Sequence, residues 1–199
     1  MLSHVMLKNM DEAKPPKRPA TYDDLLKVPD HKVAEILDGE LHVSPRPASP
    51  HGFAGTRLGS HLTPFNEGFD GPGGWWILDE PELHLGPDVL VPDLAGWRTE
   101  RLPHVPTLVG HTLAPDWVCE VVSPSTERID RQKKLRIYAR EGVRHCWLID
   151  PLEHTIEIRR LEGREWVMVA THRGNEVINP EPFDALPLPL IRLWKDPPP

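Results

Sequence analysis

The chain of 199 residues has few cysteines, an excess of negative charge and no long apolar run. Its two cysteines, Cys119 and Cys146, exclude a disulfide framework and a four-cysteine zinc site. No apolar run approaches the roughly 20 residues that a membrane span needs. The N-terminal residues 1–20 also lack the continuous apolar segment of a secretory signal. We therefore expect a cytoplasmic protein with no membrane partner.

Positive charge is also scarce, since 23 Lys and Arg face 30 Asp and Glu and the net charge is -7. A chain this acidic is not a nonspecific nucleic-acid coat, so any nucleic-acid binding must use a local basic patch. Proline, by contrast, is abundant: the 24 prolines are roughly twice the usual share, which disfavours a long helical bundle because proline breaks helix interiors.

The positions of turn-forming residues and the periodicity of apolar residues predict one domain in residues 21–194. A flexible arm is expected in 1–20 and a disordered tail in 195–199. Asp38-Gly39 predicts a β-hairpin between two strand-like runs. Helices are expected at 22–27, from about Pro50, and at 127–141 before Gly142. Strands are expected at 75–79, 82–85, 89–97, 117–122, 144–150 and around Gly163. This order indicates the α/β or α+β class, with helices packed on a mixed sheet.

Two carboxylates inside apolar runs are the most unusual feature, because the P-loop, GxGxxG, HExxH and GxSxG motifs are all absent. Asp93 lies in VLVPDLAGW and Glu120 in WVCEVV. A carboxylate in such a run is costly unless it is paired, hydrogen-bonded or bound to a metal. Two acids at neighbouring strand ends would offer hard oxygen ligands to Mg²⁺. The alternative is that each acid is solvated or salt-bridged at a strand end.

The predicted helix after Glu120 is basic, with seven Lys or Arg and three Asp or Glu in residues 127–145. Residues 79–93 hold five acids and no Lys or Arg. An acidic pocket beside a basic helix suits a metal-bound polyanion, although a basic helix can also be simply solvated. Helical spacing places Lys134 at the edge of the buried stripe, from which it can direct its charge at a neighbouring site. The same spacing groups Lys133 with Arg136 and Arg140 on the solvent side.

These residues carry a family resemblance, which covers roughly residues 20–160. The matching positions are Glu35-Ile36-Leu37-Asp38-Gly39-Glu40, Ser44-Pro45, His51, Pro92-Asp93, Pro115-Asp116, Glu120-Val121-Val122-Ser123-Pro124-Ser125-Thr126, Asp130, Lys134, Tyr138, Gly142-Val143, Trp147 and Asp150-Pro151. They resemble the Uma-type restriction endonucleases of the PD-(D/E)xK nuclease superfamily. The resemblance implies a mixed sheet flanked by helices, with an α-β-β-β-α-β core after the N-terminal hairpin.

The resemblance also implies roles for individual residues. Asp93 resembles the PD aspartate and Glu120 the acid of (D/E)xK, so both would bind Mg²⁺, with Mn²⁺ as a substitute and the Val121 carbonyl as a further ligand. Glu35 resembles an upstream acid of the catalytic site. The superfamily's lysine should follow Glu120 by two residues, but Val122 stands there. The resemblance implies that this lysine has moved to the following helix, as Lys134.

The remaining candidate residues have less definite roles. His51 matches a recurrent family position, where it could orient a carboxylate or begin the helix. Asp130 and Tyr138 could be partners of Lys134, although core packing explains Tyr138 equally well. The candidates for nucleic-acid binding share a basic side chain on the predicted helix; they are Arg131, Lys133, Arg136 and Arg140.

The resulting hypothesis is a Mg²⁺-dependent endonuclease that acts on nucleic acid, with DNA favoured over RNA by the resemblance alone. A homodimer is the expected oligomer, since symmetric dimers are the commonest. One alternative is a non-catalytic nucleic-acid-binding or regulatory module on the same fold, because fold does not imply function. Another is a metal-dependent hydrolase of a different phosphate ester.

Overall fold

The computed structural model describes residues 18–107 and 109–194. The predicted tail in 195–199 and residues 1–17 of the predicted arm lie outside the described residues. Among the residues that are described, no helix is long and apolar enough to span a membrane.

A four-stranded sheet is built around the predicted hairpin, with the strand order β2-β1-β5-β4. Its strands are β1 (Lys32–Leu37), β2 (Glu40–Pro45), β4 (Leu83–Leu85) and β5 (Asp88–Leu90). Asp38 and Gly39 have φ values of 53° and 76°, as a two-residue hairpin turn with positive φ at both central positions requires. The short helix α1 (Tyr22–Leu25) precedes the hairpin and begins with a capping box of Thr21 and Asp24.

A six-stranded mixed sheet forms the rest of the scaffold, in the order β10-β9-β8-β7-β6-β3. Its strands are β3 (Trp75–Asp79), β6 (Leu94–Arg98), β7 (Trp117–Val121), β8 (His145–Asp150), β9 (Thr155–Glu162) and β10 (Glu165–Arg173). β7 and β8 are parallel and joined by a helical crossover, while the other neighbours are antiparallel. The chain order α2, β3, β6, β7, α4, β8 confirms the expected α-β-β-β-α-β core.

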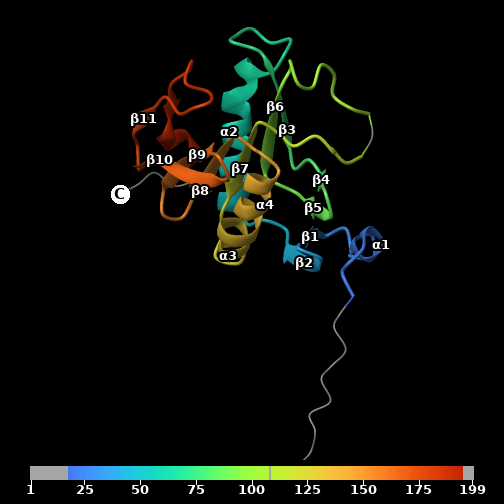
Figure 1. The fold of residues 1–199 in the computed structure, drawn as a ribbon. Helices are drawn as coiled ribbons and strands as arrows, with labels where there is room; N and C mark the ends of the chain where they lie inside the picture. Colours follow the sequence, from blue (N-terminus) through green and yellow to red (C-terminus); the bar gives the residue numbers. More distant parts are fainter. Residues whose placement is uncertain (1–17, 108, 195–199) are drawn as a thin grey trace, which may run out of the picture.

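Helices cover both faces of this sheet (Figure 1). The helix α2 (Ser49–Leu62) packs on one face, where Ala54 and Leu58 share an apolar cluster with Trp117. The crossover packs on the other face, where Leu135 and Tyr138 join a second cluster. It consists of α3 (Glu127–Ile129), η2 (Asp130–Lys134) and α4 (Leu135–Arg140). The remaining elements are η1 (Thr63–Phe65), β11 (Val177–Ile178), β12 (Leu188–Pro189) and η3 (Leu190–Leu193).

The alternation of side chains along β7 determines which face carries Glu120. Cys119 and Val121 belong to the cluster beneath α2, whereas Val118 and Val122 belong to the cluster beneath α4. The division follows from strand geometry, because successive strand residues point to opposite faces. Glu120 therefore lies on the face that the basic crossover covers.

Two predicted elements were wrong in detail, and both corrections affect the site. The run 89–97 is not one strand: β5 and β6 belong to different sheets, and the link Val91–Asp93 joins them. Pro92 has no N–H to donate to a sheet, which explains the break. The predicted helix 127–141 is interrupted by the π-helical turn η2, a feature that occurs often at functional sites.

Candidate active site

A cavity of about 310 Å³ lies where the two sheets meet, between the hairpin, the β5–β6 link, β7 and η2. Six of the predicted site residues with ionisable groups line it: Glu35, His51, Asp93, Glu120, Asp130 and Lys134. These residues come from β1, α2, the β5–β6 link, β7 and η2, so folding alone brings them together.

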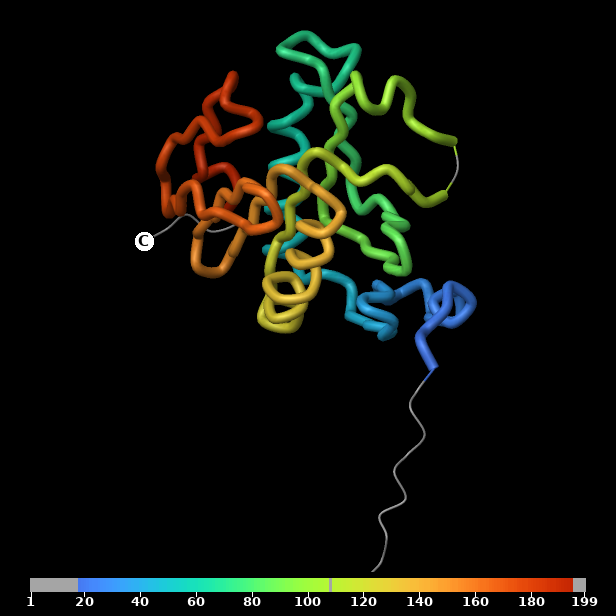
Figure 2. Tube along the Cα trace, in the orientation of Figure 1, coloured from blue at the N-terminus to red at the C-terminus, as the bar shows by residue number. Residues whose placement is uncertain are grey.

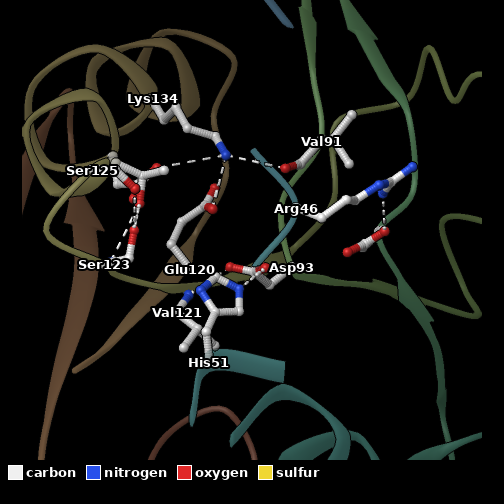
Figure 3. A network of polar contacts seen from close by, with 12 residues as sticks. Arg46, His51, Val91, Asp93, Glu120, Val121, Ser123, Ser125 and Lys134 are labelled. Atoms are coloured by element: carbon white, nitrogen blue, oxygen red, sulfur yellow. Dashed lines mark hydrogen bonds and ion pairs between the residues drawn. The ribbon is translucent and has the colours of Figure 1, made fainter. Parts of the chain in front are cut away.

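Lys134 is the centre of the polar network in this cavity (Figure 3). Its Nζ lies 2.8 Å from Oε2 of Glu120 and 3.0 Å from Oε1 of Glu35. It also donates to the Val91 carbonyl at 3.1 Å, and Asp130 Oδ1 lies 3.7 Å away. Burial alone would lower the pKa of Lys134, but the three carboxylates around it raise that pKa well above its usual value. Lys134 therefore carries a buried positive charge, held among oxygens, and is only 3% exposed.

Both carboxylate oxygens of Glu120 are held by donors from the crossover. Oε2 accepts from Lys134, and Oε1 accepts from the Tyr138 hydroxyl at 2.5 Å. Burial raises the pKa of Glu120 well above its usual value, and the neighbouring carboxylates add to this while Lys134 opposes it. Tyr138 thus has a polar role in addition to its packing in the core.

Asp93, the last residue of the β5–β6 link, is held in a similar way. Its Oδ1 lies 2.6 Å from Nε2 of His51, and its Oδ2 accepts from the Val121 N–H at 2.7 Å. The sequence left the role of His51 open, and the structure places it in the first turn of α2 against this carboxylate. The other ring nitrogen of His51, Nδ1, is buried without a hydrogen-bond partner among the described residues.

Glu35 and Asp130 complete the ring of carboxylates. Glu35 Oε1 accepts from the Val91 N–H at 2.8 Å as well as contacting Lys134. Burial raises the pKa of Asp130 to about 6, against the opposing effects of Lys134 and a hydrogen bond from Thr126. The β5–β6 link therefore supplies two backbone groups to the site, the Val91 N–H and carbonyl, which sequence reasoning did not identify. The break at Pro92 was the available signal.

The basic residues predicted to lie on the solvent side of the helix, Lys133, Arg136 and Arg140, are less buried than Lys134, and each also pairs with a carboxylate. Lys133 pairs with Glu40 and Arg136 with Asp38, both on the β1–β2 hairpin. The remaining pairs are Arg140 with Asp88 at 2.6 Å and Arg131 with Glu157 at 2.7 Å. The tube view shows the hairpin beside the crossover (Figure 2). The helical pattern did not anticipate this contact because the pattern contains no information about tertiary partners.

The chemical type of the groups that line the cavity suits a hard divalent cation. Of the described residues, five Asp or Glu and two Lys or Arg line it, and carboxylate oxygens are the ligands that Mg²⁺ prefers. As the side chains stand, however, no group of three His, Cys, Asp or Glu within the described residues is placed to hold a metal. In this arrangement, the Lys134 ammonium and the Tyr138 hydroxyl occupy both oxygens of Glu120.

Comparisons with known proteins agree with this architecture. A crystal structure described as "a putative nuclease belonging to DUF820 from Anabaena variabilis ATCC 29413" has a similar fold, with a TM-score of 0.67 at 23% identity. The similarity covers 88% of this chain and 98% of the other. None of the curated proteins that were compared matches this chain. The model of the Uma2 family, described as "putative restriction endonuclease", matches residues 19–190. The chain therefore belongs to the Uma2 family, as its sequence motifs indicated.

Proposed function

We propose that this protein is a nuclease that hydrolyses phosphodiester bonds of nucleic acid, with DNA as the favoured substrate and Mg²⁺ or Mn²⁺ as cofactor. The observation that carries the proposal is the Lys134 ammonium, 2.8 Å from Glu120 and 3.0 Å from Glu35, in a cavity that Asp93 also lines. A fixed cation in a buried site stabilises the negative charge that develops on a phosphate under attack. Membership of the Uma2 family supports the same activity.

Each network residue has a definable task in this reaction. Hydrolysis forms a bond between phosphorus and the oxygen of water and breaks the ester bond on the opposite side. The proton of the water is released, and the leaving oxygen takes up a proton. Lys134 would orient the water or stabilise the developing charge, and Tyr138 would hold Glu120 in place. His51 and the Val121 N–H would fix the orientation of the Asp93 carboxylate.

Asp93 and Glu120, with the Val121 carbonyl, are the groups that would hold a divalent ion. Such an ion would supply charge neutralisation at the phosphate and a more acidic water. The excess of acids over bases in the cavity supports this assignment. Partly buried carboxylates without a matching cation are costly, and a bound cation would offset that cost.

The proposal is tested by incubating plasmid and single-stranded DNA with the protein and Mg²⁺ or Mn²⁺. Glu120→Gln, which keeps the shape of the side chain but removes its charge, is expected to abolish most cleavage. Asp116→Asn is the matched control, because Asp116 is also a buried acid but lies outside the cavity lining. Wild-type protein that cleaves neither substrate, or equal losses in the two variants, would contradict the proposal.

A second candidate is a non-catalytic nucleic-acid-binding module on the same fold. The observation in its favour is that Lys134 and Tyr138 occupy both oxygens of Glu120. For such a module, nucleic acid should bind to wild-type protein and to Glu120→Gln with equal affinity, with no cleavage by either at any divalent ion concentration. Cleavage that depends on Glu120 excludes this candidate.

A further inference from the structure

An ion pair between Arg46 and Glu80 forms part of the cavity wall. Arg46 Nη1 lies 3.3 Å from Glu80 Oε2, and its Nη2 donates to the Asp30 carbonyl at 3.0 Å. Arg46 immediately follows β2, and Glu80 immediately follows β3, so the pair links the hairpin to the six-stranded sheet. Figure 3 shows Arg46 and its carboxylate partner on the other side of Val91 from Lys134.

The pair separates the catalytic cavity from a second one of about 420 Å³. The two cavities share four lining residues, Val33, Arg46, Glu80 and Val91. Each volume lies within or near the roughly 300–1,000 Å³ of sites that bind small ligands. Side chains of Arg46 and Glu80 are about half exposed, at 52% and 46%, so they can move apart without unfolding the core. Their separation would join the two cavities into one groove.

The backbone of Glu80 is unusual and is tied to the catalytic site. Its φ is 43°, in the left-handed region that residues other than glycine rarely adopt. Its N–H donates to the carbonyl of Asp93 at 3.0 Å. Strained residues of this kind persist where the surrounding structure holds them, and they are concentrated at functional sites. Glu80 is thus held beside Arg46 by the same residue that is proposed to bind the metal.

Arg46 is well suited to bind a phosphate. A guanidinium presents a planar fork of N–H donors, which matches carboxylate and phosphate oxygens alike. Apart from Lys134, it is the one Lys or Arg that lines the catalytic cavity within residues 18–107 and 109–194. Among the described residues, Arg46 is the basic residue that lines both cavities, whereas Lys32 lines only the second and the four residues predicted for nucleic-acid binding line neither.

We propose that Arg46 binds a backbone phosphate next to the reacting one, and that the Glu80 carboxylate holds that phosphate's place until the substrate displaces it. This inference rests on the proposed nuclease function. It assigns a single strand of nucleic acid to the groove that the two cavities form. In this scheme the Glu80 carboxylate competes with the substrate phosphate for Arg46. Only a polyanion that binds in both cavities can displace it.

The test measures binding of a short fluorescent single-stranded DNA by anisotropy, with Ca²⁺ in place of Mg²⁺ because Ca²⁺ also takes oxygen ligands. Glu80→Gln is expected to tighten binding about two- to fivefold, the range that corresponds to one exposed ion pair. Arg46→Gln should weaken binding about tenfold and reduce the salt slope by about 0.7, the value for one phosphate contact on a single strand. Arg46→Lys, which keeps the charge, should restore the salt slope.

Matched controls come from an exposed ion pair outside both cavities, that of Arg160 and Glu162, whose side chains are 44% and 55% exposed; Arg160 also pairs with Glu181. Arg160→Gln and Glu162→Gln should change affinity by less than about twofold. The decisive variant is Arg46→Gln/Glu80→Gln, in which the benefit of Glu80→Gln should disappear. If that benefit persists, Glu80 acts only as a repulsive charge and the proposal is wrong.

Failure of this inference can be distinguished from failure of the proposed function. If wild-type protein cleaves DNA but Arg46→Gln binds it with unchanged affinity and salt slope, only the role of Arg46 is overturned. Wild-type protein that neither binds nor cleaves the probe would overturn both. Melting temperatures of all variants identify any loss that comes from unfolding.

Discussion

Replacement of Lys134 by methionine should harm both the fold and the reaction, whereas the same change at its neighbour Lys133 should do little. Lys134 is buried against Glu120 and Glu35, and its removal leaves these charges without compensation. Breaking a buried pair in this way costs about 3–5 kcal/mol. Lys133 pairs with Glu40, whose side chain is 67% exposed, and an exposed pair is worth about 0.2–1 kcal/mol.

Urea unfolding at neutral pH measures this difference, and plasmid cleavage measures the effect on turnover. We expect Lys134→Met to lower the free energy of unfolding by about 3–5 kcal/mol and the cleavage rate of the folded fraction by about 10²–10³-fold. Lys133→Met should leave the cleavage rate nearly unchanged. The double variant Lys134→Met/Glu120→Gln should be more stable than the sum of the single losses indicates, by roughly 1–3 kcal/mol, because it removes both members of the pair.

Equal destabilisation by the two lysine substitutions would refute the reasoning, since it would mean that Lys134 is not buried among carboxylates. Additive losses in the double variant would also refute it, because additivity excludes direct coupling between Lys134 and Glu120.

Three further predictions concern the charges of the site. Asp130→Asn should raise the free energy of unfolding at neutral pH by up to about 3 kcal/mol. The native state keeps the Asp130 proton up to about pH 6, whereas the unfolded chain releases it near 3.8. The stability of the wild-type protein therefore falls as the pH rises between these two values. Urea unfolding at several pH values checks this, and a gain that persists at pH below 3.8 would contradict it. Millimolar Mg²⁺ or Mn²⁺ should raise the melting temperature of wild-type protein but not of Asp93→Asn, and an equal shift in both would count against Asp93 as a ligand. Val122→Lys in the Lys134→Met background should restore part of the lost cleavage, because Val122 shares the sheet face of Glu120; a folded but inactive double variant would show that the lysine must come from the helix.

The sequence predicted most of the scaffold because its strongest signals are local. Asp38-Gly39 fixes the hairpin turn, and the alternation through Val118 and Val122 places Glu120 on one face of β7. The run 89–97 was misread because its apolar residues form an uninterrupted pattern on either side of Pro92. A pattern of this kind shows that residues are buried, but it does not show that they are buried in the same sheet.

The site could be predicted only in part for the same reason. Asp93 and Glu120 were identified as acids inside apolar runs and Lys134 by its helical spacing, and the family resemblance suggested their roles. The structure brings all three to one cavity. The partners of Lys134 on the β5–β6 link, and the contact of Arg46 with Glu80, depend on tertiary packing that no local pattern encodes. The π-helical turn that carries Lys134 likewise has no sequence signal in a single chain.

The charge distribution around the cavity has a consequence for substrate binding. The acidic hairpin pairs with the basic crossover through Glu40 and Asp38, so much of the positive potential of the crossover is already neutralised within the protein. In the part of the chain that the structure describes, the cavity itself is lined by five acids and two bases. A phosphate brought within about 4 Å of an unpaired carboxylate is repelled by about 1 kcal/mol in water and by more in a buried site. We therefore propose that nucleic acid enters this cavity together with additional positive charge, so that a divalent cation would assist binding as well as chemistry.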